Sequence, residues 1–230
     1  MKPRVAIVAA MERELRPLVR GWKREMTAEG VTIYTSDRAI ALYAGLGAQR
    51  AWLATTAALR LGPIRRIISA GWAGGLHEGI VPGGVWRVRE VVNSATGEVL
   101  EVTPADGTKT VGAVLVTANT VTSAADKQRM RQMYSADLVD MEASAVAEVA
   151  RRNKIPFSAI KAVSDGHDFD LPRMERFTTE DGQFLHVSFA AYVGLRPIWW
   201  KPVARLARDS GRASRNLAAE LERYLSEDGE

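Results

Sequence analysis

Short apolar runs that suit buried strands alternate along this chain with stretches in which apolar residues recur at helical spacing. The expected strands are residues 5–10, 31–35, 39–43, 64–70, 86–92, 98–102, 111–117, 138–141 and 157–163. Alternation of this kind is typical of a largely parallel sheet that is covered by helices on both faces. The pattern therefore predicts an α/β fold with three layers, α/β/α.

Helix signals lie between these runs. The expected helices are residues 12–21, 48–61, 123–134 (capped by Thr122 and Ser123), 143–153, 184–194 and 203–225. A glycine-rich turn is expected at residues 71–75, and Gly62-Pro63 is a typical helix stop. No internal repeat or low-complexity linker interrupts the pattern. We expect a single domain over residues 1–230, with a helical C-terminal extension at about 184–226.

Acidic side chains follow three of the expected strands. Glu14 comes shortly after residues 5–10, Glu142 directly after 138–141, and Asp165 just after 157–163. In α/β sheets, ligands bind beyond the carboxyl ends of the strands, so the convergence predicts a site there. Taken alone, each carboxylate could equally stabilise a helix N-terminus or a turn.

Composition narrows the chemistry. The 230 residues are 47% hydrophobic and 25% charged, which is typical of a globular protein. The absence of cysteine excludes disulfides, thiolate metal sites and a cysteine nucleophile, and fits a reducing compartment; we expect a cytoplasmic protein. The first apolar run is broken at once by Glu12, so we interpret it as a strand and not as a signal peptide. The three histidines have no metal-ligand spacing, and no metal or other cofactor is expected.

Four short motifs at the expected strand ends carry a family resemblance. AMEREL at residues 10–15 resembles an A-M-x-x-E motif, and GWAGGL at 71–76 resembles G-S-A-G-G-L. DMEASAVA at 140–147 resembles M-E-A/G-x-A, and IKAVSD at 160–165 resembles a strand that ends in S-D. Together, in this order, they resemble the methylthioadenosine/S-adenosylhomocysteine nucleosidases of the nucleoside phosphorylase superfamily. The resemblance implies a mixed, twisted central sheet and usually a homodimer.

The resemblance also implies roles for the matching residues. Glu14 matches the glutamate that positions and activates the attacking water, and Glu142 the one that holds the ribose hydroxyls. Met141 matches the residue that packs on the sugar. Asp165 matches the aspartate that contacts the purine edge and helps to protonate N7, and Ser164 the serine that orients it.

These roles are chemically consistent. Breaking a glycosidic bond passes through an oxocarbenium-like sugar, and the departing purine must be neutralised by an acid. A carboxyl group can be that acid if burial raises its pKa. The predicted activity is hydrolysis of the N-glycosidic bond of a 5′-substituted adenosine, with release of adenine.

Three features around the expected site differ from the family pattern. Trp72 replaces a small residue with a hydroxyl group, and the indole of Trp72 would fill or reshape part of the site. We expect Trp72 and its neighbours Ala73 and Gly74 to bind substrate. Val121 stands where the family often has an aromatic residue that stacks on the purine. The short connection at 93–97 replaces a longer segment that closes the 5′ pocket, so a bulkier apolar 5′ group is expected to fit.

The C-terminal region joins tryptophans to basic residues. Trp199 and Trp200 precede Lys201, and further arginines follow up to residue 215. This region resembles that of phosphorylase-like proteins encoded with hopanoid lipid synthesis, whose substrate is a lipid-linked adenosine. It predicts a peripheral contact with a membrane or lipid; the alternative is that both tryptophans pack the last helix onto the domain.

Other functions are weighed against hydrolysis. A phosphorylase needs cationic or amide donors for phosphate, whereas no arginine adjoins the glycine-rich turn and Glu14 would repel the anion. A catalytically weak protein that binds adenine nucleosides is the other alternative, because of Trp72. GLGAQR at 45–50 lacks the third glycine of a dinucleotide-binding motif, and no nucleic-acid-binding motif accompanies the basic residues.

Overall fold

The computed structural model describes residues 3–103, 112–170, 192 and 196–227. Its strands are β1 (Arg4–Ala9), β2 (Lys23–Met26), β3 (Thr32–Thr35), β4 (Ala39–Tyr43), β5 (Ile64–Gly75), β6 (Val85–Asn93), β7 (Val99–Glu101), β8 (Ala113–Thr117), β9 (Leu138–Asp140) and β10 (Phe157–Asp165). Its helices are α1 (Glu12–Leu15), α2 (Ala48–Leu59), α3 (Ala124–Tyr134), α4 (Ala143–Arg152) and α6 (Trp200–Glu227), and the 3-10 helix η2 (Pro197–Trp199) precedes α6.

The strands form one mixed sheet. Its order is β10-β6-β8-β9-β5-β1-β4-β3-β2, and β7 pairs with β6. A further pairing of β10 with β5 closes β10, β6, β8, β9 and β5 into a ring. Strands β4, β1, β5 and β10 are parallel neighbours, so their carboxyl ends lie at the same edge.

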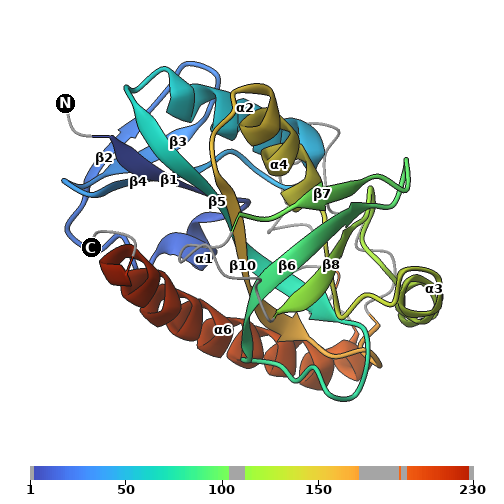
Figure 1. Ribbon diagram of the computed structural model, residues 1–230. Coiled ribbons are helices and arrows are strands. Elements are labelled where there is room, and N and C mark those ends of the chain that lie inside the picture. The colour runs from blue at the N-terminus through green and yellow to red at the C-terminus, as the bar shows by residue number, and fades with distance from the viewer. Residues whose placement is uncertain (1–2, 104–111, 171–191, 193–195, 228–230) are drawn as a thin grey trace.

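Helices cover both faces of this sheet, as Figure 1 shows. Helices α2 and α4 lie together on one face, where their small side chains join a buried cluster with β1, β5 and β10. Helices α1 and α6 cover the opposite face and enclose a second cluster. Residues 5–9 of β1 lie between the two layers and are at most 3% exposed, which explains why this strand is apolar throughout. The three-layer α/β/α prediction is confirmed.

The first helix is shorter than its apolar spacing predicts. The helix expected at 12–21 ends at Leu15, and single turns continue to Gly21. Pro17 has no amide hydrogen to donate into the helical ladder, and Gly21 adopts a positive φ of 79° that leads the chain away.

The glycine-rich segment is strand and not turn. Strand β5 does not stop at residue 70 but continues to Gly75, because Gly71 pairs with Lys161 of β10 and Gly74 with Val139 of β9. Partners on both sides satisfy the backbone, so the segment needs no turn. The expectation of a turn at 71–75 is wrong.

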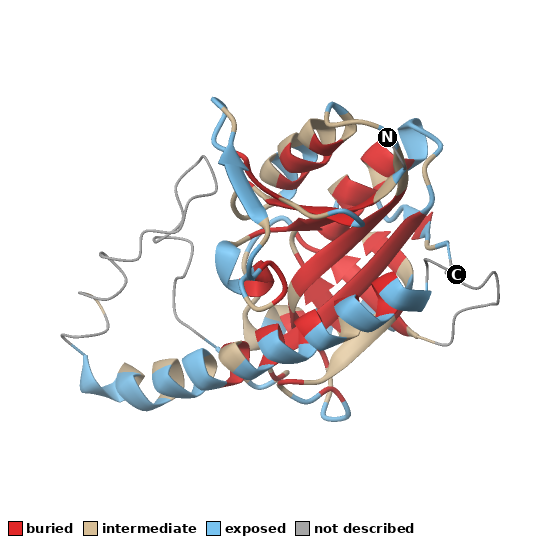
Figure 2. Ribbon diagram, turned by 90° about the vertical axis from the view of Figure 1, so that its left-hand side faces the viewer, coloured by how far each residue is buried: buried red, intermediate tan, exposed pale blue. Residues whose placement is uncertain are grey.

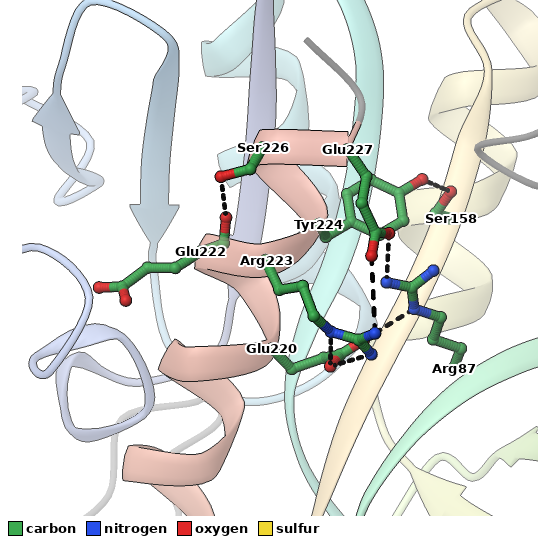
Figure 3. Close-up of polar contacts among 8 residues, drawn as sticks. All are labelled: Arg87, Ser158, Glu220, Glu222, Arg223, Tyr224, Ser226 and Glu227. Carbon is green, nitrogen blue, oxygen red and sulfur yellow. Dashed lines mark hydrogen bonds and ion pairs between the residues drawn. The ribbon is translucent and has the colours of Figure 1, made fainter. Parts of the chain in front are cut away.

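Helix α6 is anchored by its C-terminal half. Buried residues from Ala213 to Leu225 recur every three or four positions and face the sheet, while much of the first half is exposed (Figure 2). Near its end, Arg87 of β6 contacts Glu220 and Glu227, each at 2.7 Å. Tyr224 forms a hydrogen bond of 2.8 Å with Ser158 of β10 (Figure 3).

The region before α6 is described only in part. The helix expected at 184–194 lies outside the described residues except for residue 192, as does the start of the strand expected at 111–117. Helix α6 starts at residue 200, three residues earlier than expected, which confirms a C-terminal helix. Within the described ranges, no helix is both long and apolar enough to cross a membrane.

Candidate active site

A cavity of about 180 Å³ lies where the carboxyl ends of β1, β5 and β10 meet β9. The cavity is lined by all nine site residues that were predicted from the sequence: Glu14, Trp72, Ala73, Gly74, Val121, Met141, Glu142, Ser164 and Asp165. Ala10, Met11, Leu46, Thr120, Thr122, Val139 and Asp140 complete the lining. The structure thus places the three carboxylates at one cavity, and their individual roles stay predictions.

Glu14 is held by backbone amides. One carboxylate oxygen accepts hydrogen bonds from the amides of Ala10 at 2.9 Å and Met11 at 2.7 Å, and the other from the amide of Trp72 at 2.7 Å. The side chain is only 3% exposed, and burial raises its pKa against the lowering effect of these amides and of Lys161. Glu14 therefore both caps the first turn of α1 and presents a fixed carboxyl group at the cavity.

Gly71 makes this position of Glu14 possible. A Cβ atom on Gly71 would lie 2.8 Å from a carboxylate oxygen of Glu14, closer than real side chains approach. The φ angle of Gly71 is +143°, which side chains rarely adopt. The glycine in the motif is thus required by the close approach of the carboxylate.

Glu142 lines the same cavity and lies at the N-terminus of α4. Its carboxylate accepts a 2.7 Å hydrogen bond from the amide of Gly47, the residue that precedes α2. Burial, followed by repulsion from Asp140, raises the pKa of Glu142 to about 7. A group with this pKa can accept hydrogen bonds from two sugar hydroxyls when it is ionised, which suits the predicted role.

A buried cation lies behind the two glutamates. Lys161 on β10 is 1% exposed, and its Nζ lies 2.9 Å from Asp140 and 3.0 Å from the hydroxyl of Ser69. Burial alone would lower the pKa of Lys161, but Asp140, Glu142 and Glu14 outweigh it and raise the pKa. The site therefore combines several buried carboxylates with a permanent positive charge.

Ser164 and Asp165 end β10 and also line the cavity. The hydroxyl of Ser164 lies 2.5 Å from one carboxylate oxygen of Asp165, as expected for a serine that orients the aspartate. The other oxygen forms an ion pair with Lys127 of α3. Both oxygens of Asp165 are therefore fixed from the protein side.

Trp72 is anchored away from the carboxylates. Its indole nitrogen donates a 3.0 Å hydrogen bond to Ser214 of α6, and the ring packs against the cluster beneath that helix. The residue still contributes to the cavity lining. The tryptophan that departs from the motif thus ties the site to the C-terminal helix.

Comparison with known proteins decides the family. The family model described as Phosphorylase superfamily matches residues 4–110 and 108–188, which is more than half of the chain. The chain belongs to the Phosphorylase superfamily. This confirms the superfamily that the four motifs indicated.

Similar proteins include nucleosidases and a futalosine hydrolase by name. A 5′-methylthioadenosine/S-adenosylhomocysteine nucleosidase of Bacillus cereus is 26% identical over 201 residues, covering 70% of this chain and 85% of the relative. The solved 5′-methylthioadenosine nucleosidase of Arabidopsis thaliana superposes with a TM-score of 0.74 at 21% identity, over 97% of this chain and 95% of that one. The futalosine hydrolase of Helicobacter pylori reaches 0.71 at 15% identity, over 98% of each chain. These likenesses confirm the fold.

Besides the residues that complete the cavity lining, sequence reasoning missed Lys161, Lys127 and the amide of Gly47, which hold the acidic side chains of the site. The sequence does contain a signal for Lys161, because a lone lysine in an otherwise apolar strand must have a buried partner of opposite charge. Lys127 lies in a strongly polar helix and Gly47 acts through its amide, so neither was distinguishable from its neighbours. Among the described residues, no cluster of three or more acidic or histidine side chains is arranged to hold a metal ion.

Proposed function

We propose that this chain is a purine nucleosidase that hydrolyses the N-glycosidic bond of a 5′-substituted adenosine and releases adenine. The observation that carries the proposal is the convergence of Glu14, Glu142 and Asp165 on one cavity in a chain of this superfamily. The names of the similar proteins, two nucleosidases and a futalosine hydrolase, support hydrolysis.

The three carboxylates divide the reaction between them. Glu14 takes a proton from water as its oxygen attacks C1′ of the sugar. Glu142 accepts hydrogen bonds from the ribose hydroxyls, which fixes the sugar and favours its positive charge. The bond between C1′ and N9 breaks, its electron pair goes to the purine, and the Asp165 end of the cavity delivers a proton to N7.

Water is favoured over phosphate as the nucleophile. Phosphate sites use arginine, lysine or helix N-termini to offset the charge of the anion. The described lining of this cavity contains no arginine or lysine, and Glu14 and Glu142 would repel phosphate. This supports hydrolysis over the phosphorylase alternative.

The test is base release by the purified chain in phosphate-free buffer. We expect adenine and the free sugar from 5′-methylthioadenosine or S-adenosylhomocysteine, with no gain in rate when phosphate is added. Futalosine is assayed beside them, because one structural neighbour is a futalosine hydrolase. A requirement for phosphate, with ribose 1-phosphate as product, would establish the phosphorylase. Binding without turnover of any substrate would establish the binding protein.

The 5′ substituent is proposed to be larger and more apolar than a methylthio group. The cavity of about 180 Å³ is smaller than the roughly 300–1,000 Å³ of ordinary ligand pockets, so a long 5′ group must extend beyond its described lining. Each methylene that leaves water contributes about 0.8 kcal/mol, or roughly tenfold in affinity for every two methylenes. A series of 5′-alkylthioadenosines scored by kcat/KM tests this, and a steep fall with chain length would contradict it.

Two partners are proposed: an anionic lipid surface and a second copy of the chain. Ile198 is 77% exposed and Trp200 is 55% exposed near the basic start of α6, which supports a contact with an anionic lipid surface. Co-sedimentation with phosphatidylglycerol vesicles, compared with the Trp200→Ser variant, tests this. The homodimer implied by the family is checked by light scattering of the purified protein.

A further inference from the structure

A second buried lysine lies next to Asp165, which lines the cavity. Lys127 is 2% exposed, and its Nζ forms an ion pair with one carboxylate oxygen of Asp165. The same ammonium donates to the carbonyl oxygens of Gly166, at 2.7 Å, and Phe169, at 3.4 Å. Lys127 is not among the residues that line the cavity, whereas its partner Asp165 is.

The local structure is built to place this ammonium. Lys127 lies in the first turns of α3, whose start is fixed by reciprocal hydrogen bonds between Ser123 and Asp126. Gly74 of β5, which has no side chain, leaves room for Lys127 and Asp165. A Cβ atom there would lie 3.1 Å from Cε of Lys127 and 3.2 Å from Asp165. Elements far apart in sequence thus converge on one contact.

The pair has a chemical consequence for base departure. Purine leaves only if a proton reaches it as the bond to C1′ breaks, and the ammonium of Lys127 places a donor proton directly against a carboxylate oxygen of Asp165. The proton must then be shared by the pair. It leaves Nζ of Lys127, is carried by the carboxyl group of Asp165, and is bound by N7, while the proton that water gives to Glu14 returns to Lys127 through solvent.

We propose that Lys127 is a positioning residue for departure of the base, which orients Asp165 and supplies the proton that Asp165 passes to N7. The inference rests on the proposed nucleosidase function and goes beyond it, because it assigns leaving-group activation to a pair and not to Asp165 alone. It predicts that Lys127 matters only when the leaving group needs protonation.

The experiment compares two substrates in each enzyme sample. One is 5′-methylthioadenosine, and the other is the 5-methylthioriboside of 4-nitrophenol, whose phenolate leaves without protonation. Lys127→Met is expected to lower kcat/KM for the adenosine by about 10²-fold and for the phenyl riboside by less than about threefold. The ratio of the two values is independent of the fraction of folded enzyme, so a loss of stability cannot imitate the result.

Three further variants sharpen the test. Lys127→Arg keeps the charge and should restore at least tenfold of the lost adenosine activity. Arg129→Met removes an exposed cation of the same helix, paired with Asp126, and should leave the ratio unchanged. Adding Lys127→Met to Asp165→Asn should cause no further loss, because the two residues act as a unit.

The outcomes distinguish a failure of the role proposed for Lys127 from a failure of the proposed nucleosidase function. An active wild-type enzyme whose Lys127→Met variant loses both substrates equally, or whose double variant loses activity additively, would overturn the role of Lys127 and leave the nucleosidase intact. A wild-type enzyme that releases neither leaving group would overturn the proposed function, and this inference with it.

Discussion

Replacing Glu14 by glutamine tests the carboxylate that the reaction depends on most. Glutamine keeps the shape of the side chain but has one acceptor oxygen in place of two. Glu14 accepts three backbone hydrogen bonds, two at one oxygen and one, from Trp72, at the other. If the amide oxygen faces Ala10 and Met11, the amide nitrogen must face the N–H of Trp72, and a buried donor loses its partner.

The expected loss of stability follows from the number of backbone donors left without a partner. One unsatisfied buried donor costs about 1–3 kcal/mol, and removal of a buried charge offsets part of that cost. We expect Glu14→Gln to be about 2 kcal/mol less stable, which lowers the Tm of a domain of this size by roughly 4–8 °C. Turnover should fall by ~10²-fold or more, because the general base for water is lost.

Glu12, two residues before Glu14, provides the matched control. Glu12 is in the same turn of α1 but is exposed, with its carboxylate 3.3 Å from the hydroxyl of Tyr34. Glu12→Gln should change neither Tm nor turnover appreciably. Both variants are assayed for base release and by thermal melting. If Glu14→Gln melts lower yet turns over at the wild-type rate, Glu14 is only a cap of α1 and the proposed base is wrong.

Three other predictions follow from the site. Because burial raises the pKa of Glu142 from 4.5 to about 7, the folded state binds more protons than the unfolded state between these values, so wild-type stability should fall as pH rises from 4.5 to 7. The fall should be smaller in Glu142→Gln, where Glu14 still contributes but Glu142 does not, and chemical denaturation at several pH values that shows parallel curves for the two proteins would refute this. Gly71→Ala should lose about 1–3 kcal/mol of stability and most of the activity. Gly30→Ala, which is also at a positive φ (+81°) but has open space around it, should stay active; equal activities in the assay for base release would contradict the steric argument. Trp72→Phe should cost about 1 kcal/mol through the lost hydrogen bond to Ser214 and keep turnover within a few-fold, and a large loss of turnover at unchanged Tm would show that the indole acts on the substrate.

The sequence predicted the position of the site better than the shape of its elements. Motifs at the ends of β1, β5 and β10 located lining residues because the carboxyl ends of these parallel strands meet at one edge, while β9 reaches the same cavity antiparallel to β5. The limits of α1 and β5 were misjudged for local reasons. Pro17 ends a helix whose apolar spacing continues, and the glycines of β5 look like a turn until both pairing partners are known.

Electrostatic partners were harder to predict than the acids themselves. Asp140 and Lys161 are 21 positions apart, and Lys127 and Asp165 are 38 apart, so only the folded sheet brings each pair together. Local patterns report which face of an element is buried but not which distant charge will meet it. The anchoring of Trp72 to α6 was hidden for the same reason, since Ser214 lies 142 residues away.

The distribution of charge fits the transition state of glycoside hydrolysis. Asp140 and Asp165 each have a lysine partner, whereas within the part of the chain that the structure describes neither Glu14 nor Glu142 forms an ion pair. Keeping these two glutamates buried is unfavourable in the resting protein, because burial raises their pKa values. The sugar becomes positive as the base departs, and preorganised carboxylates stabilise that cation without reorganisation. The same arrangement disfavours an anionic nucleophile, so the cost of burying the two glutamates favours water as the attacking group.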